Sequence, residues 1–425
     1  MLEVRAFRAL RFDFNRFDGD LSSLIAPPYD VLDENDKRSL LSRSDRNIVA
    51  IDLPHLPPQS AGPPERYEAA GRTLRNWRAD GTLIRDPDPA LYVCHQSFAY
   101  AGRSFTRRMF IACLRLEAFD RGIILPHERT FGGPKEDRLA LMKATRCQLS
   151  PIFGLYSDSA DRVGAVLGEV IGRRPDANAT LDGVENRLWS VTDSRVIDAV
   201  TGAMREKKVY IADGHHRYGT ALMYRDWLRN QDRSNRPLPD EHPAHFVMFV
   251  LASMDDPGCL ILPYYRTIAG IDLDTLLQAW SEGVEMIAWG PQPGTGDLTL
   301  HDGVSGREVV VRFTRRDVLR ELEPKQVAPW YGLDYAYLHR YLIDELLTAA
   351  PSRVDTASAA PKIHYLKSPE EAKRVAREQR GVALLVKATP MAHLKAVSEA
   401  GGLMPQKSTY FHPKLATGMT MYSLE

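Results

Sequence analysis

The feature that most constrains the fold is an abrupt change of pattern at Gly214. Residues 208–212 form a short apolar run typical of a buried strand, and residues 218–228 carry apolar side chains at helical spacing. A glycine permits the backbone conformation that a tight turn needs. The pattern predicts a strand in a mixed sheet, a turn over residues 213–217 and a helix directly after it.

Strand-like and helix-like segments alternate along the chain, which favours an α/β (α+β) fold. Residues 91–98 and 108–116 read as strands with a Tyr100-Ala101-Gly102 turn between them, and this pattern predicts a hairpin. Residues 67–78 and 138–144 are helical by composition and spacing.

Three stretches are typical of surface loops. Residues 54–64 hold five prolines, which regular structure does not tolerate. Residues 230–243 are polar and proline-rich, and residues 349–361 are rich in small side chains. No internal repeat is visible. We expect two domains, an N-terminal α/β domain over 1–270 and a C-terminal α/β domain over 271–425, with residues 403–418 returning to the functional site.

The composition excludes several classes of protein. Lys and Arg number 55 and so do Asp and Glu, whereas dedicated nucleic-acid binders usually carry a basic surplus. The four cysteines lie outside metal-ligand spacing, which indicates free thiols in a reducing compartment. The N-terminus lacks a signal-peptide pattern, and the longest apolar stretch, 246–252, is too short to span a bilayer. We therefore expect a cytoplasmic protein that binds neither nucleic acid nor membrane.

The turn carries the strongest chemical pattern of the chain. A helix that opens after Gly214 presents free N–H groups and a positive dipole end, which attract anions. His215, His216 and Arg217 add donors suited to phosphate oxygens. Asp213 could coordinate Mg²⁺ or accept a proton from a hydroxyl. In the alternative interpretation, Asp213 caps the helix and the histidines are ordinary surface groups.

A second segment, 125–135, surrounds a Gly-Gly turn with polar side chains. His127, Arg129 and Lys135 would bind phosphate, and Glu128 is a candidate general base or Mg²⁺ ligand. The pattern is not a Walker loop, because its Gly-x4-Gly-Lys-Ser/Thr spacing is absent. A solvated charged loop is the alternative.

Two further segments are candidates for the same site. Near the C-terminus, Lys407, Ser408 and Thr409 form a cluster of donors, and Lys414 follows within reach. At residues 26–32, two prolines set a rigid loop that would hold the next two residues, Tyr29 and Asp30, for substrate binding. A structured tail and a plain loop are the alternatives. Phosphate recognition needs several donors at once, so we expect 126–135 and 405–414 to converge on the turn.

Taken together, these motifs resemble the bacterial and archaeal family called domain of unknown function 1015. The resemblance spans nearly the whole chain, with Tyr265 as a departure where that family is expected to have histidine. The turn is also similar to that of free-serine kinases of the ParB/sulfiredoxin fold. The resemblance is carried by residues 26–31, 125–130, 144–146 with 150–153, 211–218 and 407–414.

The resemblance implies a ParB/sulfiredoxin-like mixed-sheet core with additional α/β elements, and a turn that grips nucleotide phosphates. We expect a kinase that uses ATP or ADP, with Mg²⁺, to phosphorylate a small hydroxyl metabolite such as free serine, in a chain that could form a homodimer. Glu128, Asp213 and His215 are the catalytic candidates. The alternatives are a ParB-like nucleotide switch and an interaction protein that binds no nucleotide.

Overall fold

The computed structural model describes the chain except for residues 131, 232–236, 291–295 and 349–361. The chain forms two compact units. The first comprises Met1–Pro126, Thr130–Leu260 and Pro413–Glu425, and the second comprises His127–Arg129 and Ile261–His412. The loop expected at 349–361 lies outside the described residues, as does part of the loop expected at 230–243.

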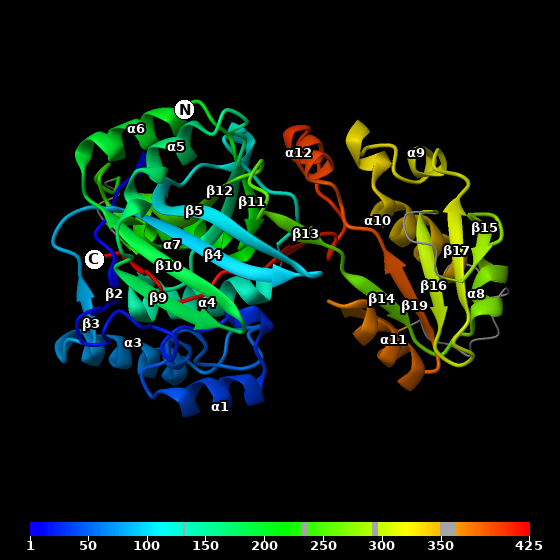
Figure 1. Cartoon of the computed structure of the whole chain (residues 1–425), viewed down its shortest axis with the longest axis horizontal. Coiled ribbons are helices and arrows are strands. Elements are labelled where there is room, and N and C mark those ends of the chain that lie inside the picture. The colour runs from blue at the N-terminus through cyan, green and yellow to red at the C-terminus, as the bar shows by residue number, and fades with distance from the viewer. Residues whose placement is uncertain (131, 232–236, 291–295, 349–361) are drawn as a thin grey trace. The chain divides into compact units, whose positions relative to one another are not determined.

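A nine-stranded mixed sheet forms the centre of the first unit (Figure 1), which confirms the predicted α/β class. Strand β1 pairs with β5 off the main path. The strands are β1 (Val4–Arg5) and, in sheet order, β6 (Ile124–Leu125), β11 (Val209–Asp213), β8 (Ile152–Tyr156), β12 (Phe246–Ser253), β5 (Arg103–Arg115), β4 (Leu91–Tyr100), β10 (Val184–Val191) and β9 (Ala177–Leu181).

The hairpin of β4 and β5 is confirmed. Tyr100 pairs with Arg103, so the turn has two residues, Ala101 and Gly102. Both have positive φ angles, 48° and 74°, which is the conformation of a type I′ turn. Alternate residues of the two strands point to opposite faces of the sheet.

Helices and shorter strands complete the first unit. The predicted helix at 67–78 is observed as α3, and the helix predicted from 138 begins six residues earlier as α4. The helices are α1 (Glu34–Arg43), α2 (Val49–Asp52), α3 (Pro64–Ala79), α4 (Gly132–Thr145), α5 (Arg162–Gly168), α6 (Ser194–Met204) and α7 (His215–Gln231). Two small sheets pair β2 (Leu10–Phe12) with β3 (Leu83–Arg85) and β7 (Cys147–Gln148) with β21 (Tyr422–Ser423).

A large apolar core lies against the central sheet of this unit. Side chains of α5, α6 and the start of α7 pack with those of the central strands, among them Val93, Phe110 and Phe249. All four cysteines are buried free thiols, as the composition predicted. No described helix has both the length and the apolar character needed to cross a membrane.

The second unit is built on a six-stranded antiparallel sheet. Its strands, in order, are β15 (Val284–Trp289), β17 (Glu308–Phe313), β16 (Leu298–Asp302), β19 (Val382–Val386), β14 (Tyr265–Ile268) and β18 (Ile363–Leu366). A further pair joins β13 (Leu260–Leu262) and β20 (Tyr410–His412). The helices of the second unit are α8 (Leu273–Ala279), α9 (Val318–Leu322), α10 (Asp334–Ala336), a π-helix (Tyr337–Thr348), α11 (Pro369–Glu378) and α12 (Met391–Glu399).

Candidate functional site

Strand β11 leads directly into the predicted turn, and a β-bulge sets the direction of Asp213. Ile211 pairs with Gly154, but Asp213 pairs with Phe153, so the register shifts between the two. In a regular strand Asp213 would share the face of Ile211, because side chains repeat every second residue. The bulge instead places it on the face of Phe153, in the manner by which bulges re-aim side chains.

Gly214 joins this strand to α7, which confirms the predicted strand and helix but shortens the turn predicted over 213–217 to Gly214 alone. Its φ angle is +94°, a conformation that side-chain-bearing residues rarely adopt. The helix begins at His215 rather than at Tyr218, so His215, His216 and Arg217 lie in its first turn and not in a preceding loop. The apolar repeat placed the start of the helix at residue 218, because the three residues before it are histidines and an arginine and do not belong to an apolar pattern.

Arg217 folds back over the turn. A Cβ at Gly214 would lie 3.0 Å from Arg217 Nε, so the guanidinium covers the glycine. Its Nη2 donates to Asp213 Oδ1 at 3.4 Å, and Nη1 donates to the carbonyl of Pro151. The arginine side chain is thereby fixed between β11 and the start of β8.

Lys414 reaches the turn from the C-terminal segment. Its Nζ donates to Asp213 Oδ2 at 2.8 Å, and both side chains are 18% exposed. Burial raises the pKa of Asp213, but Lys414 and Arg217 outweigh that effect and hold the pKa well below its usual range. Asp213 is therefore a weak proton acceptor.

Positive charge exceeds negative charge around this carboxylate. Lys414 and Arg217 contact it directly, and the buried Arg107 also interacts with it electrostatically. The N-terminus of a 17-residue helix adds its dipole at the same place. Such an arrangement attracts an anion.

A buried polar network lies behind Arg217. Ser150 donates to both carboxylate oxygens of Asp52, at 3.0 and 2.9 Å, and Arg138 Nη1 donates to the Asp52 carbonyl at 2.6 Å. A cavity of about 40 Å³, large enough for ordered water, is lined in part by Asp52, Arg138, Ser150 and Arg217. The network fixes the backbone at Pro151, to which Arg217 is bound.

The loop with Tyr29 and Asp30 belongs to the same network. It forms a short 3₁₀ turn, Tyr29–Val31, and the Tyr29 side chain is buried. The centre of its ring lies 3.9 Å from the guanidinium carbon of Arg138. Asp30 is exposed on this turn. Tyr29 thus anchors the loop through its ring, whereas Asp30 is accessible to a ligand.

The Gly-Gly segment corrects one expectation. Gly132 and Gly133 do not form a loop but begin helix α4. A Cβ at Gly133 would lie 2.2 Å from the Gln59 carbonyl oxygen, so the glycine permits a close approach of two backbones. Lys135 packs its aliphatic stem against Gly219 of α7, 3.1 Å from the position of a Cβ there.

The other predicted residues come together within the second unit. The His127 Nε2 atom lies 2.9 Å from Thr409 Oγ1, and the Lys407 backbone N–H donates to Glu128 Oε1 at 3.4 Å. Ser408 Oγ donates to the Pro405 carbonyl at 2.5 Å, while Arg129 is exposed. The convergence of these residues and the turn on one ligand stays a prediction.

Sequence reasoning missed the buried arginines and amides that hold these segments. Arg266 is fully buried and donates to the carbonyls of Lys407 at 2.8 Å and Tyr264. Arg107, Gln96 and Arg138 are also buried. In a single sequence, a polar residue inside a strand or helix is expected to face solvent. The pattern therefore gave no indication that these side chains are buried.

The predicted Mg²⁺ fits Asp213 poorly. Both of its oxygens already bind cationic side chains, which a metal ion would have to displace. Within the described parts of the chain, no group of three or more His, Cys, Asp or Glu side chains is arranged to hold a metal. Glu128 stays a predicted ligand.

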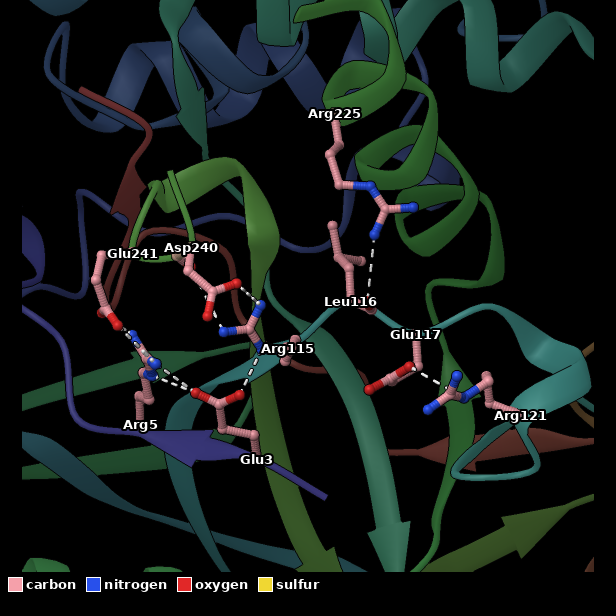
Figure 2. A network of polar contacts seen from close by, with 9 residues as sticks. All are labelled: Glu3, Arg5, Arg115, Leu116, Glu117, Arg121, Arg225, Asp240 and Glu241. Atoms are coloured by element: carbon pink, nitrogen blue, oxygen red, sulfur yellow. Dashed lines mark hydrogen bonds and ion pairs between the residues drawn. The ribbon is translucent and has the colours of Figure 1, made fainter. Parts of the chain in front are cut away.

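Helix α7 is tied to the sheet by the segment that follows β5. The Tyr218 hydroxyl donates to the Glu117 carbonyl at 2.6 Å and accepts from the Glu117 N–H at 2.9 Å. Figure 2 shows Arg225, two turns further along the helix, donating to the Leu116 carbonyl at 3.2 Å. These bonds fix the helix whose first turn carries the candidate residues.

A family model described as protein of unknown function (DUF1015) matches residues 4–350. No curated protein matches the chain.

Solved structures are similar to the chain at low scores. A free serine kinase variant in complex with AMP has a TM-score of 0.34 and 11% identity, over 71% of this chain and 90% of that chain. SbnI with a C-terminal truncation from Staphylococcus aureus has a TM-score of 0.35 and 12% identity, over 73% and 86%. A conserved hypothetical protein from Pyrococcus furiosus has a TM-score of 0.32 and 12% identity, over 71% and 93%. At these scores the structures carry no argument about function.

Proposed function

This chain belongs to the DUF1015 family, and we propose that it is a nucleotide-dependent kinase that transfers a phosphoryl group from ATP or ADP to a small hydroxyl metabolite. The observation that carries the proposal is the excess of positive charge around Asp213 at the start of α7. Phosphoryl transfer needs mainly positioning and electrostatic stabilisation, and such a charge excess provides both for a phosphate chain.

In this proposal the first turn of α7 binds the phosphates. Backbone N–H groups of the helix start, with His216 and Arg217, donate to phosphate oxygens. Lys414 exchanges part of its contact with Asp213 for a phosphate oxygen. Asp213 then holds the cations in place between binding events, and its low pKa keeps it charged throughout.

Further predicted donors would complete phosphate recognition. The proposed contacts from the segment 125–135 are His127, Arg129 and Lys135. His215, at the start of α7, is a further proposed contact. Lys407, Ser408 and Thr409 are proposed contacts from the C-terminal segment. Glu128 and the buried Arg266 bind the backbone of Lys407, and the Ser408 hydroxyl donates to the Pro405 carbonyl within the second unit.

Glu128 is the better candidate for the general base. A base must accept a proton from the acceptor hydroxyl, and Asp213 is a weak acceptor because two cations hold its pKa low. Asp30, exposed beside the buried Tyr29 ring, is the proposed contact for the acceptor molecule. The motif similarity to free-serine kinases makes serine the first acceptor to test.

A phosphoryl-transfer assay tests this function. Wild-type protein is incubated with Mg²⁺ and ATP or ADP, with and without each member of a panel of hydroxyl metabolites, serine first. The proposal expects nucleotide consumption that depends on one acceptor and yields its phosphate ester. Binding without transfer to any member would remove the kinase proposal.

A nucleotide switch is the second candidate, and the same cation excess favours it. A switch binds, or slowly hydrolyses, nucleotide without an acceptor, so the acceptor-free arm of the assay separates it from a kinase. An interaction protein would bind no nucleotide in either arm.

A further inference from the structure

Three buried polar side chains stand in one row across the large sheet. Asn186 of β10 pairs with Gln96 of β4, and Gln96 pairs with Arg107 of β5. They are 2%, 1% and 0% exposed. Burying such groups is costly unless their hydrogen bonds are made, so this row requires a compensating set of partners.

The partners are the neighbours in the row and the backbone of the C-terminal segment. Gln96 Nε2 donates to Asn186 Oδ1 at 2.9 Å, and Arg107 Nη2 donates to Gln96 Oε1. Gln96 Nε2 also donates to the carbonyl of Lys414 at 3.2 Å, and Arg107 Nη2 to the carbonyl of Pro413 at 2.6 Å. The row therefore binds the backbone carbonyls of Pro413 and Lys414, and the side chain of Lys414 contacts Asp213.

The rest of the segment is attached independently. Thr417 and Ala26 exchange two backbone hydrogen bonds, of 2.8 and 3.1 Å, and Met421 exchanges two with Leu10. Strand β21 then pairs with β7. Residues 417–424 therefore have attachments of their own, whereas the row donates to the carbonyls of Pro413 and Lys414.

We propose that Gln96 and Arg107 are positioning residues, which fix the backbone of Pro413 and Lys414 so that the Lys414 ammonium is held at Asp213 for an anionic ligand. The geometric part stands on the contacts above, and the ligand part rests on the proposed nucleotide binding. Neither side chain acts on the ligand directly. Their effect passes through Lys414.

The substitution Gln96→Met tests this by removing the amide while keeping a long side chain. Tyr92→Phe is the matched control, because Tyr92 lies on the same strand and face, is fully buried, and donates to Asp86 at 2.6 Å instead of to the C-terminal segment. Both variants lose a buried polar group. Gln96→Glu is the second variant, since a carboxylate still accepts from Arg107 but cannot donate to the Lys414 carbonyl.

The first measurement needs no nucleotide. Lysine acetylation by acetic anhydride is followed at Lys414 by mass spectrometry under native conditions. Positioning predicts faster labelling of Lys414 in Gln96→Met and Gln96→Glu than in the wild type or in Tyr92→Phe. Equal labelling in all folded variants would overturn the positioning role.

The second measurement is the ADP dissociation constant. Gln96→Met should weaken binding about two- to tenfold, as expected for one lost hydrogen bond. In a Lys414→Met background the same substitution should have no further effect, because coupled residues are not additive. Full additivity would overturn the proposal. Faster labelling in a protein that binds no ADP would keep the geometric part and remove the proposed function.

Discussion

Asp213 illustrates how single charges define the site. Its carboxylate is desolvated, yet Lys414 and Arg217 keep it ionised. Its single negative charge faces two contacting cations, and this arrangement is the basis of the proposed anion site. An isolated aspartate as a helix cap would not need a lysine brought from 201 residues away.

The low pKa of Asp213 predicts a pH-dependent contribution to stability. A carboxyl group whose pKa is lower in the folded than in the unfolded protein stabilises the fold above its unfolded pKa, near 4. That contribution is lost as pH falls below about 4. Urea denaturation should therefore show Asp213→Asn less stable than wild type at pH 7, with a smaller difference at pH 3. A difference that grows on acidification would contradict the pairing.

Gly214 provides a second prediction at this scale. Gly214→Ala should lower the free energy of unfolding by about 1–3 kcal/mol, because alanine is strained at a φ of +94° and its Cβ would press on Arg217. Gly202→Ala in α6 is the control, since a Cβ there meets nothing within 4 Å and should stabilise the helix by about 0.5–1 kcal/mol. Thermal or urea denaturation measures both, and equal effects would argue against strain.

Glu128 is expected to act on turnover rather than on nucleotide affinity. Glu128→Gln keeps the shape and removes the proton acceptor, so kcat should fall about 10²-fold or more while the ADP dissociation constant stays nearly unchanged. Asp213→Asn should lower kcat less, because its carboxylate is a weak base. Steady-state kinetics and calorimetry check this, and unchanged turnover in Glu128→Gln would exclude it as the base.

At the scale of elements, α7 is held by a few polar bonds at its start. Tyr218→Phe leaves the Glu117 N–H without its hydroxyl partner and should cost about 1–3 kcal/mol of stability. The control is Tyr224→Phe in the same helix, where the ring packs against Trp227. Denaturant titration should separate the two variants. A Tyr218→Phe protein as stable as the control would show that packing alone holds the helix.

Local patterns predicted the hairpin, β11 and α7, because each depends on neighbouring residues: a two-residue turn, an apolar run and a helical repeat. The bulge before Asp213 was not predictable, since it depends on pairing with Phe153 of a distant strand. The same reason hid the start of α4, where Gly133 meets Gln59. For the site, the donors of the turn and Lys414 were visible as residue types, but the pairing of Lys414 with Asp213 was not.

Two further groups of polar contacts show the same limit. Glu3 bridges Arg5 and Arg115 at the strands β1 and β5, as Figure 2 shows, although its neighbours in sequence give no sign of this. Arg266 supports residue 407 from far away in the chain. Polar contacts between distant residues, such as Glu3 with Arg115 and Arg266 with Lys407, depend on the folded arrangement and leave no periodic trace in a single sequence.

At the scale of the whole molecule, the two units carry separate groups of candidate residues. The first holds the turn, Lys414 and the loop with Asp30, and the second holds Glu128 with residues 407–409. The central claim concerns the first group alone: its excess of positive charge binds the phosphates of a nucleotide. It can therefore be tested without knowing the acceptor.

The most direct test is calorimetric titration of ADP into wild type, Arg217→Ala and Arg229→Ala. Arg229 lies at the other end of α7 and pairs with Asp226 on the surface, so it matches the lost charge without touching the turn. Losing a charged hydrogen bond to the phosphate should cost about 1.5–3 kcal/mol of binding free energy, which raises the dissociation constant roughly 10- to 100-fold. The account predicts that Arg217→Ala binds ADP at least tenfold more weakly than both other proteins. Equal affinity in all three, or no ADP binding by the wild type, would contradict it.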